Sequence, residues 1–198
     1  MDPVRYYLAL IALVAYPAAI AYWLLIHPFV GFWRRIGLGV TYALVLPAIT
    51  GVGYVMFQLR EPLLALDFGT HYGLLVVALP LLVWGMYIDV VCRRSLKVRI
   101  LVGIPELAPD RSPTELLTGG IYAKMRHPRY VSAFLGGVAT ALIANFAAVY
   151  VICVLVVPCL GAIVLLEERE LRARFGEEYE RYCRRVPRFL PRMGTGSG

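Results

Sequence analysis

Four long stretches of this chain contain no Asp, Glu, Lys or Arg, and apolar residues dominate each of them. They cover residues 6–33, 36–59, 68–88 and 130–166. Because a helix needs about 20 apolar residues to cross a bilayer, each of the first three predicts one transmembrane helix. The fourth is 37 residues long and fits two helices joined by a tight turn near Asn145. We therefore predict an all-α integral membrane protein with about five transmembrane helices.

The flanking residues suggest where these helices begin and end. The first three are predicted at about 4–27, 36–59 and 69–91. The fourth begins at Arg126-His127-Pro128, because proline is favoured at an early helical position. The fifth runs from about 147 to Cys183, with its last part forming an amphipathic extension in the cytoplasm.

Composition excludes a soluble globular domain. Sixty per cent of the 198 residues are hydrophobic, and the mean hydropathy is +0.69. A soluble domain of this size could not bury so much apolar surface. The net charge is +7, but the basic residues flank the predicted spans, which favours contact with anionic lipid over nucleic acid.

The basic residues also predict an orientation. With five spans, all of the 20 Lys and Arg except Arg5 and Arg60 fall on one side. Positive residues stay in the cytoplasm, so the N-terminus is expected outside and the C-terminus inside, in a bacterial or archaeal inner membrane. A four-span alternative, with residues 130–166 as one helix, would place the Arg-rich tail outside.

Two further patterns bear on processing and on metal binding. Ala19-Ile20-Ala21 can pass for a signal-peptide cleavage site, but the apolar run continues beyond it, so the first helix is expected to be retained. The four cysteines show no Cys-x-x-Cys spacing. We expect neither a disulfide nor a metal site.

Polar side chains gather where the fourth predicted helix begins. Residues 119–130 read Gly-Gly-Ile-Tyr-Ala-Lys-Met-Arg-His-Pro-Arg-Tyr, and Glu167-Glu168 follow after the apolar run. A bilayer tolerates such groups only where they are satisfied or used. Purely structural helices would not need them, so this cluster is the candidate site.

These motifs resemble the isoprenylcysteine carboxyl methyltransferase family, whose wider group includes phospholipid N-methyltransferases. The resemblance rests on residues 120–130, the helical hairpin, Glu167-Glu168, Phe175-Gly-Glu-Glu-Tyr-Glu-Arg-Tyr182 and Val186–Pro191. It covers about residues 114–192. It implies a pocket for S-adenosylmethionine at the cytoplasmic membrane face. The Gly-x-Gly-x-x-Gly loop of soluble nucleotide-binding enzymes is absent, so helices would have to build this pocket.

Each part of the implied cofactor has candidate partners. Its carboxylate needs cationic or N–H donors, which Arg126, His127 and the helix start at Pro128 can supply. Its ammonium needs a carboxylate, Glu167 or Glu168. The adenosine needs apolar walls and a few hydrogen bonds. The candidates for that part are Thr114, Glu115, Leu116, Leu117, Tyr122 and Tyr130.

The resemblance implies direct displacement of the methyl group by a lipophilic acceptor, with S-adenosylhomocysteine as the product. The donor is already activated, so the enzyme mainly supplies proximity and orientation. An amine acceptor must also lose a proton, and Glu167, Glu168 or Tyr122 can assist. The candidate catalytic residues are Glu167, Tyr122 and Arg126.

Each candidate also has a purely structural interpretation. His127 can cap a helix, and the two tyrosines can belong to an interfacial belt. Glu168 can pair with Arg172 at i, i+4, so Glu167 is the residue expected to face the pocket. Arg129 is expected to face lipid, and Arg188 to face solvent or lipid headgroups.

The nature of the acceptor stays open at this stage. Prenylcysteine enzymes carry an arginine one turn before the Glu pair, whereas residues 162–166 here contain no cation. A phospholipid amine or another hydrophobic small molecule fits at least as well. Two alternatives remain: an NADPH-dependent sterol-reductase-like enzyme, suggested by Tyr182-Cys-Arg-Arg-Val-Pro187, and a non-enzymatic transporter or assembly protein, disfavoured because no repeat is present.

The chain is predicted to divide into three parts. Three N-terminal transmembrane helices occupy residues 1–91. The cofactor-binding catalytic core, with two transmembrane helices, occupies residues 92–193. Residues 194–198 have the composition of a linker remnant.

Overall fold

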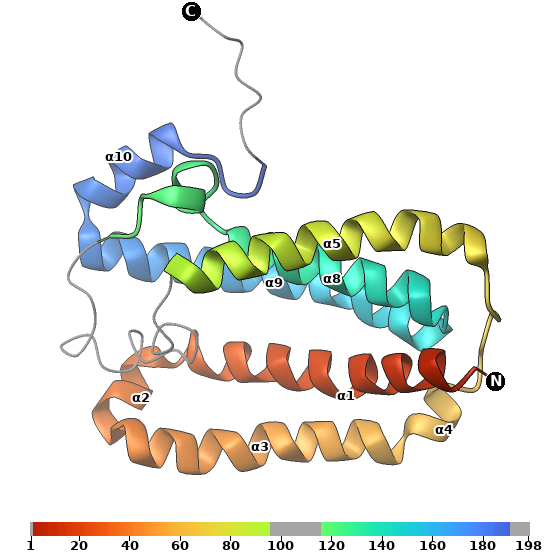
Figure 1. The fold of residues 1–198 in the computed structure, drawn as a ribbon. Helices are drawn as coiled ribbons and strands as arrows, with labels where there is room; N and C mark the ends of the chain where they lie inside the picture. The colour runs from red at the N-terminus through yellow and green to blue at the C-terminus, as the bar shows by residue number, and fades with distance from the viewer. Residues whose placement is uncertain (1, 96–115, 191–198) are drawn as a thin grey trace, which may run out of the picture.

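The computed structural model describes residues 2–95 and 116–190, and helices dominate both ranges (Figure 1). The long helices are α1 (Pro3–Ile26), α3 (Leu38–Gln58), α5 (Tyr72–Ser95), α8 (Pro128–Ala144) and α9 (Ala147–Phe175). The short ones are α2 (Val30–Ile36), α4 (Arg60–Leu63), the 3-10 helix η2 (Gly120–Ala123) and α10 (Glu177–Arg185). The five long helices correspond to the five that the uncharged stretches predict. Of the candidate site residues, Thr114 and Glu115 lie outside the described residues.

The long helices lie side by side, with α1 in the middle. α1 packs against α3 on one side and against α8 and α9 on the other, while α5 packs against α8 (Figure 1). One end of the bundle holds α2, the end of α5, η2 and α10. The opposite end holds α4 and the turn between α8 and α9.

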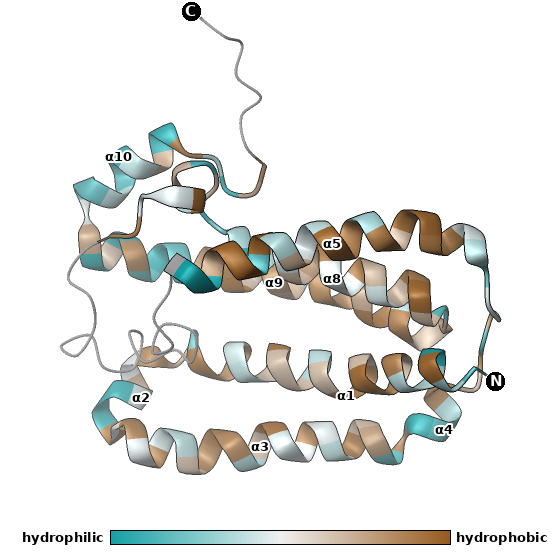
Figure 2. Ribbon diagram, in the orientation of Figure 1, coloured by the Kyte–Doolittle hydropathy of each residue, from teal (hydrophilic) through white to brown (hydrophobic). Residues whose placement is uncertain are grey.

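The surface of this bundle is apolar along most of its length. α1, α3, α5 and α9 are long and apolar enough to cross a membrane, and α8 is a shorter apolar helix of 17 residues, about 25 Å long. Hydrophobic residues occupy the middle of the helices and polar residues gather near the ends (Figure 2). Val76, Val83 and Trp84 are exposed. The architecture is that of an all-α integral membrane protein.

Local sequence signals predict most helix boundaries correctly. α8 begins at Pro128, and Asn145 takes a left-handed conformation (φ 56°) in the turn to α9. The prediction of one continuous helix from 147 to Cys183 is wrong. The chain breaks at Gly176 (φ 51°), which separates α9 from α10. Glycine adopts this conformation without strain because it has no Cβ.

α5 and α8 approach each other closely at Gly85. A Cβ atom there would lie 3.3 Å from the Gly136 nitrogen and 3.3 Å from the Ser132 carbonyl oxygen. Ser132 also donates a hydrogen bond from Oγ to the Gly85 carbonyl, at 2.9 Å. Small residues allow this kind of close helix contact in membranes. The contact fixes α5 against the helix that carries the candidate site.

A buried arginine holds the opposite end of the bundle together. Arg5 on α1 donates from Nε to the Ala144 carbonyl, at 3.0 Å, and forms an ion pair with Asp67. The chain around Asp67 pairs with the α8–α9 turn through Phe68 N to Asn145 O, at 3.1 Å. Because the last carbonyls of a helix lack partners within it, these contacts complete the C-terminus of α8. Arg5 thereby joins α1, the α4–α5 loop and the hairpin.

We expect Arg5→Ala to destabilise the protein, because it leaves Asp67 and the Ala144 carbonyl without their main partner. Breaking a largely buried pair costs on the order of 3 kcal/mol. The Tm in detergent should therefore fall by about 5–10 °C. The control is Arg60→Ala, whose partner Glu61 is exposed and whose loss costs less than about 1 kcal/mol. Equal Tm values for the two variants would contradict this role of Arg5.

Candidate functional site

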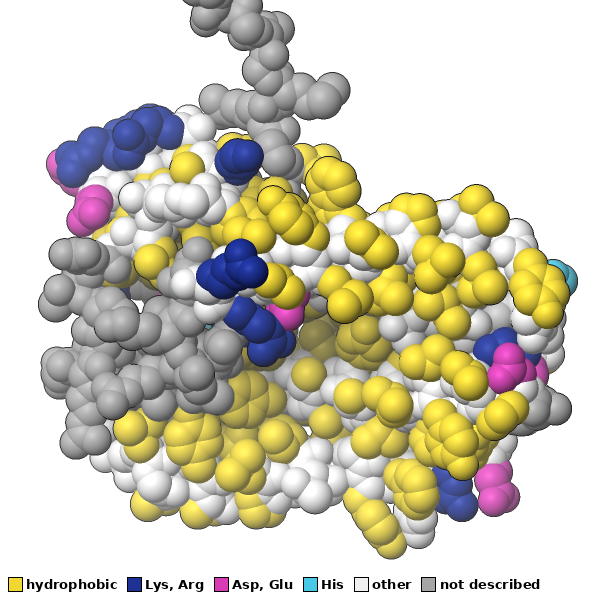
Figure 3. Space-filling model, in the orientation of Figure 1, with side chains coloured by type: hydrophobic (Ala, Val, Ile, Leu, Met, Phe, Trp, Pro, Cys, Tyr) yellow, Lys and Arg dark blue, Asp and Glu magenta, His cyan; other side chains and the backbone are white. Residues whose placement is uncertain are grey.

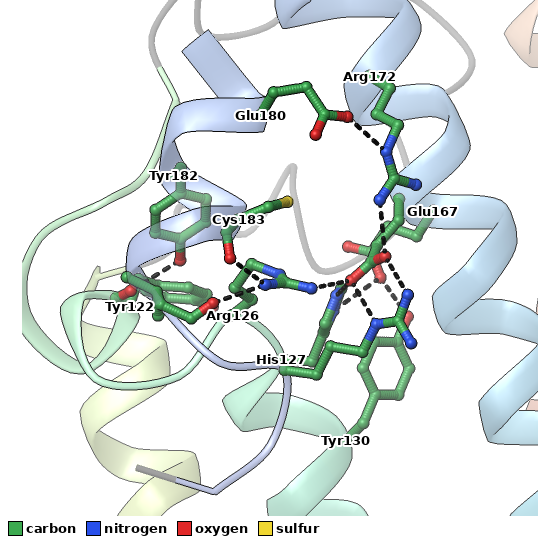
Figure 4. Close-up of polar contacts among 12 residues, drawn as sticks. Tyr122, Arg126, His127, Tyr130, Glu167, Arg172, Glu180, Tyr182 and Cys183 are labelled. Carbon is green, nitrogen blue, oxygen red and sulfur yellow. Dashed lines mark hydrogen bonds and ion pairs between the residues drawn. The ribbon is translucent and has the colours of Figure 1, made fainter. Parts of the chain in front are cut away.

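A buried carboxylate organises the end of the bundle where η2, α8, α9 and α10 meet (Figure 4). Glu168 on α9 has no exposed surface. Its Oε1 accepts a hydrogen bond from Arg126 Nη2, at 2.8 Å, and lies 3.2 Å from His127 Nε2. Arg188 donates to both carboxylate oxygens, at 3.0 and 2.8 Å. Since an isolated buried charge is very unfavourable, this set of donors is what allows Glu168 to lie there.

Arg126 also ties the start of α8 to the C-terminal segment. Its Nη1 donates to the Cys183 carbonyl at 3.1 Å and to the Val186 carbonyl at 2.6 Å. The main-chain N–H groups of residues 126 and 127 donate to the carbonyls of residues 187 and 188, at 2.9 Å each. The segment after α10 is therefore bound along the residues that precede α8.

Arg188 and Tyr182 connect the C-terminal segment to the rest of the site. Arg188 is 43 % exposed, as expected, and it also forms hydrogen bonds with Glu168, which were not predicted and which raise its pKa above the ordinary value. Tyr182 is buried, which raises its pKa to about 12. It remains protonated at neutral pH and donates to the Tyr122 carbonyl, at 2.7 Å.

Glu167 has different surroundings from its neighbour Glu168. Its side chain is 28 % exposed, and Oε2 accepts a hydrogen bond from the Tyr130 hydroxyl at 2.7 Å. His127 Nδ1 lies 3.7 Å from the same oxygen. His127 thus lies between the two carboxylates, with one ring nitrogen near each.

A cavity of about 670 Å³ opens beside these groups, within the range typical of small-molecule sites. Its walls come from the α1–α2 junction, residues 116–117 and η2, the start of α8, the last turns of α9, and α10. Eight of the predicted site residues line it: Leu116, Leu117, Tyr122, Arg126, His127, Pro128, Tyr130 and Glu167. Glu168 is not part of the lining, because it is enclosed by its arginines.

The phenol of Tyr122 was a candidate proton acceptor. It is buried in the cavity wall, and burial raises the pKa of Tyr122 well above its ordinary value. Its hydroxyl group therefore stays protonated at neutral pH. In that state it can donate a hydrogen bond to a ligand.

Sequence reasoning missed the contribution of the first helices to this cavity. His27, at the end of α1, and Arg34, on α2, line the wall opposite α8. Both approach Glu170 of α9, with His27 Nδ1 at 3.5 Å from Oε2 and Arg34 Nη2 at 4.0 Å from Oε1. The available signal was a histidine at the end of a helix whose uncharged run extends from residue 6 to its C-terminus. Arg129, expected to face lipid, also lines the cavity and lies over the Trp23 ring of α1.

The family model for phospholipid methyltransferase matches residues 73–178, which is more than half of the chain. The chain belongs to the phospholipid methyltransferase family. The matched region includes α5, η2, α8 and α9, and therefore most of the walls of the cavity.

Relatives of this phospholipid methyltransferase family member include two named methyltransferases and a protein named for metal resistance. The chain is 35 % identical over 77 residues to protein-S-isoprenylcysteine O-methyltransferase of Schizosaccharomyces pombe, covering 38 % of the chain and 33 % of the relative. It is 37 % identical over 92 residues to methanethiol S-methyltransferase of Crocosphaera subtropica, covering 44 % and 34 %. It is 35 % identical over 83 residues to nickel-cobalt-cadmium resistance protein NccN of Alcaligenes xylosoxydans xylosoxydans, covering 42 % and 39 %.

These matches leave most of each relative unaligned, since the chain spans 33–39 % of their length. No solved structure matches the chain. In residues 2–95 and 116–190, no group of three or more His, Cys, Asp or Glu residues is placed to hold a metal ion. What the relatives share with the chain is confined to a segment that overlaps the matched family region.

We expect Glu168→Gln to loosen the C-terminal segment, because it removes the charge that Arg126 and Arg188 share. Trypsin should cleave after Arg184, Arg185 or Arg188 roughly tenfold faster or more in this variant, since losing one member of a buried ion pair costs several kcal/mol. Limited proteolysis with mass spectrometry measures this directly. Arg172 pairs with Glu168 at i, i+4, at 3.4 Å, and with Glu180, at 2.8 Å. Glu180→Gln, which removes the more exposed of these two partners, is the control. Equal cleavage of both variants would contradict the proposed anchoring.

Proposed function

We propose that this protein is an S-adenosylmethionine-dependent methyltransferase that acts on a lipophilic acceptor at the cytoplasmic face of the membrane. The observation that carries the proposal is the position of Glu167 and His127 on the wall of a cavity that the start of α8 also lines. A partly exposed carboxylate beside a histidine and a helix N-terminus suits a ligand that carries both an ammonium and a carboxylate.

The residues present fit that cofactor part by part. Glu167 can accept hydrogen bonds from its ammonium, and His127, at the positive end of the α8 dipole, can hold its carboxylate. Arg126 Nε is a buried donor with no hydrogen-bond partner among the described residues, so it can also bind the carboxylate. Leu116, Leu117 and Tyr122 offer apolar surface for the adenosine.

S-adenosylmethionine supplies a methyl group already activated on a sulfonium, so the task of the chain is orientation. Tyr130 fixes the Glu167 carboxylate through its hydroxyl. Glu168 holds Arg126 just before the N-terminus of α8, and α10 forms one side of the cavity. These contacts limit both the freedom of a bound ligand and its access to water.

Several observations support a lipophilic acceptor and a cytoplasmic site. Apolar side chains of membrane-spanning segments, including Leu166, contribute to the walls.

The basic side chains concentrate at the end of the bundle that carries the cavity, while hydrophobic side chains cover its middle (Figure 3). Since positive residues remain in the cytoplasm, this end is assigned to the cytoplasm. The catalytic unit then includes residues 116–190 together with the end of α1.

We expect S-adenosylhomocysteine to bind the detergent-purified protein with a micromolar Kd. His127→Ala and Glu167→Gln should each weaken it roughly tenfold or more, since a hydrogen bond to a charged group is worth about 1.5–3 kcal/mol. Isothermal titration calorimetry measures these affinities, and Glu178→Gln, on the exposed side of α10, is the matched control. A folded wild-type protein that binds NADPH and not S-adenosylhomocysteine would overturn the proposal in favour of the reductase alternative.

A further inference from the structure

A third carboxylate lies in the cavity, and the roles described above do not use it. Glu170 follows Glu167 by three residues on α9, which places both on the same helix face. Both line the cavity. Glu170 lies towards the α1 wall, near His27, whereas Glu167 lies towards the α8 wall, near Tyr130. The two carboxylates therefore face different parts of one cavity.

The hydrogen bonding of Glu170 differs from that of its neighbours. Glu168 accepts from several arginine nitrogens, and Glu167 accepts from Tyr130. Glu170 Oε1 is buried and receives no hydrogen bond from any described residue, and its side chain is 20 % exposed. A buried carboxylate oxygen that receives no donor is costly. A ligand that donates a hydrogen bond at this point would remove the cost.

We propose that Glu170 binds the reacting head of the acceptor and takes its proton, so that the acceptor is an amine or a thiol and not a carboxylate. This inference rests on the proposed methyltransferase function. The shared chemistry of the two heads is a nucleophilic atom, nitrogen or sulfur, that carries a hydrogen. A carboxylate head has no such hydrogen at neutral pH, and Glu170 would repel it.

In the proposed step Glu170 is the proton acceptor and the cofactor sulfur is the leaving group. The N–H or S–H proton of the acceptor passes to the Glu170 carboxylate and then to solvent. The lone pair left on the acceptor atom forms the new bond to the methyl carbon. The electron pair of the methyl–sulfur bond stays on the cofactor sulfur, which becomes neutral.

The surrounding charges favour this assignment. Arg126 is already bound by Glu168 and Arg129 lies over the Trp23 ring, while Arg169 and Arg174 also line the cavity. Arg34 lies 4.0 Å from Glu170, close enough to compensate its charge when the cavity is empty of acceptor. Glu170 thus lies where the polar head of the acceptor would approach a cofactor bound near Glu167.

The test uses three probes with the same tail: dodecylamine, dodecanethiol and dodecanoate. The protein is placed in phosphatidylcholine nanodiscs, whose quaternary ammonium accepts no methyl group. Wild type, Glu170→Gln and the exposed control Glu177→Gln are compared. Two quantities are measured for each: the Kd of S-adenosylhomocysteine by calorimetry, and kcat and KM for methyl transfer to each probe.

We expect wild type and Glu177→Gln to methylate dodecylamine, dodecanethiol or both. Glu170→Gln should lose roughly tenfold or more in kcat while its Kd for S-adenosylhomocysteine changes less than about twofold. Transfer to dodecanoate alone, transfer to none of the probes, or an unchanged kcat in Glu170→Gln would overturn the assignment. Absence of S-adenosylhomocysteine binding in wild type would instead refute the underlying methyltransferase function, so the two failures are distinguishable.

Discussion

A carboxylate with no exposed surface at the edge of a membrane has to be neutralised by the chain itself, and the rest of the site depends on how this is done. Glu168 is neutralised by Arg126, 42 residues before it, and by Arg188, 20 residues after it. Compensating one charge therefore brings together the residues before α8, the end of α9 and the segment beyond α10. With these fixed, α10 forms one wall of the cavity, and the start of α8 forms another.

The rotation of α9 about its axis gives Glu167, Glu168 and Glu170 three different surroundings. Successive residues of an α-helix point about 100° apart, so Glu167 and Glu168 diverge while Glu167 and Glu170 share a face. Glu168 is directed into the arginines, and the other two line the cavity. A rotation of α9 by one residue would bury a different carboxylate and leave the arginines facing the cavity. The Glu168 network therefore also fixes the chemistry of the cavity wall.

Signals that act over a few residues made the sequence predictions succeed. The uncharged stretches, Pro128 at a helix start and Asn145 at a turn each specify local structure, and all three agree with the observed helices. The break at Gly176 was missed because apolar residues continue at helical spacing on both sides of it. The partnership of Arg188 with Glu168 and the approach of His27 to Glu170 were also missed. Both join residues far apart in the chain, and nothing in one sequence specifies which distant charges meet.

The α1 wall of the cavity and the wall formed by α9 come from different parts of the sequence. The proposed choice of acceptor therefore depends on both parts. The region that matches the family begins at residue 73 and carries Glu167, Glu168 and Glu170, whereas His27 comes from α1, outside that region. α1 is a rod of about 36 Å, held at its other end where Arg5 binds the α8–α9 turn. Because packed helices move as units, its position at the Arg5 end also sets the distance from His27 to Glu170. Substitutions along α1 can therefore reshape the wall near Glu170, where we propose that the acceptor binds, while the Glu168 network stays as it is.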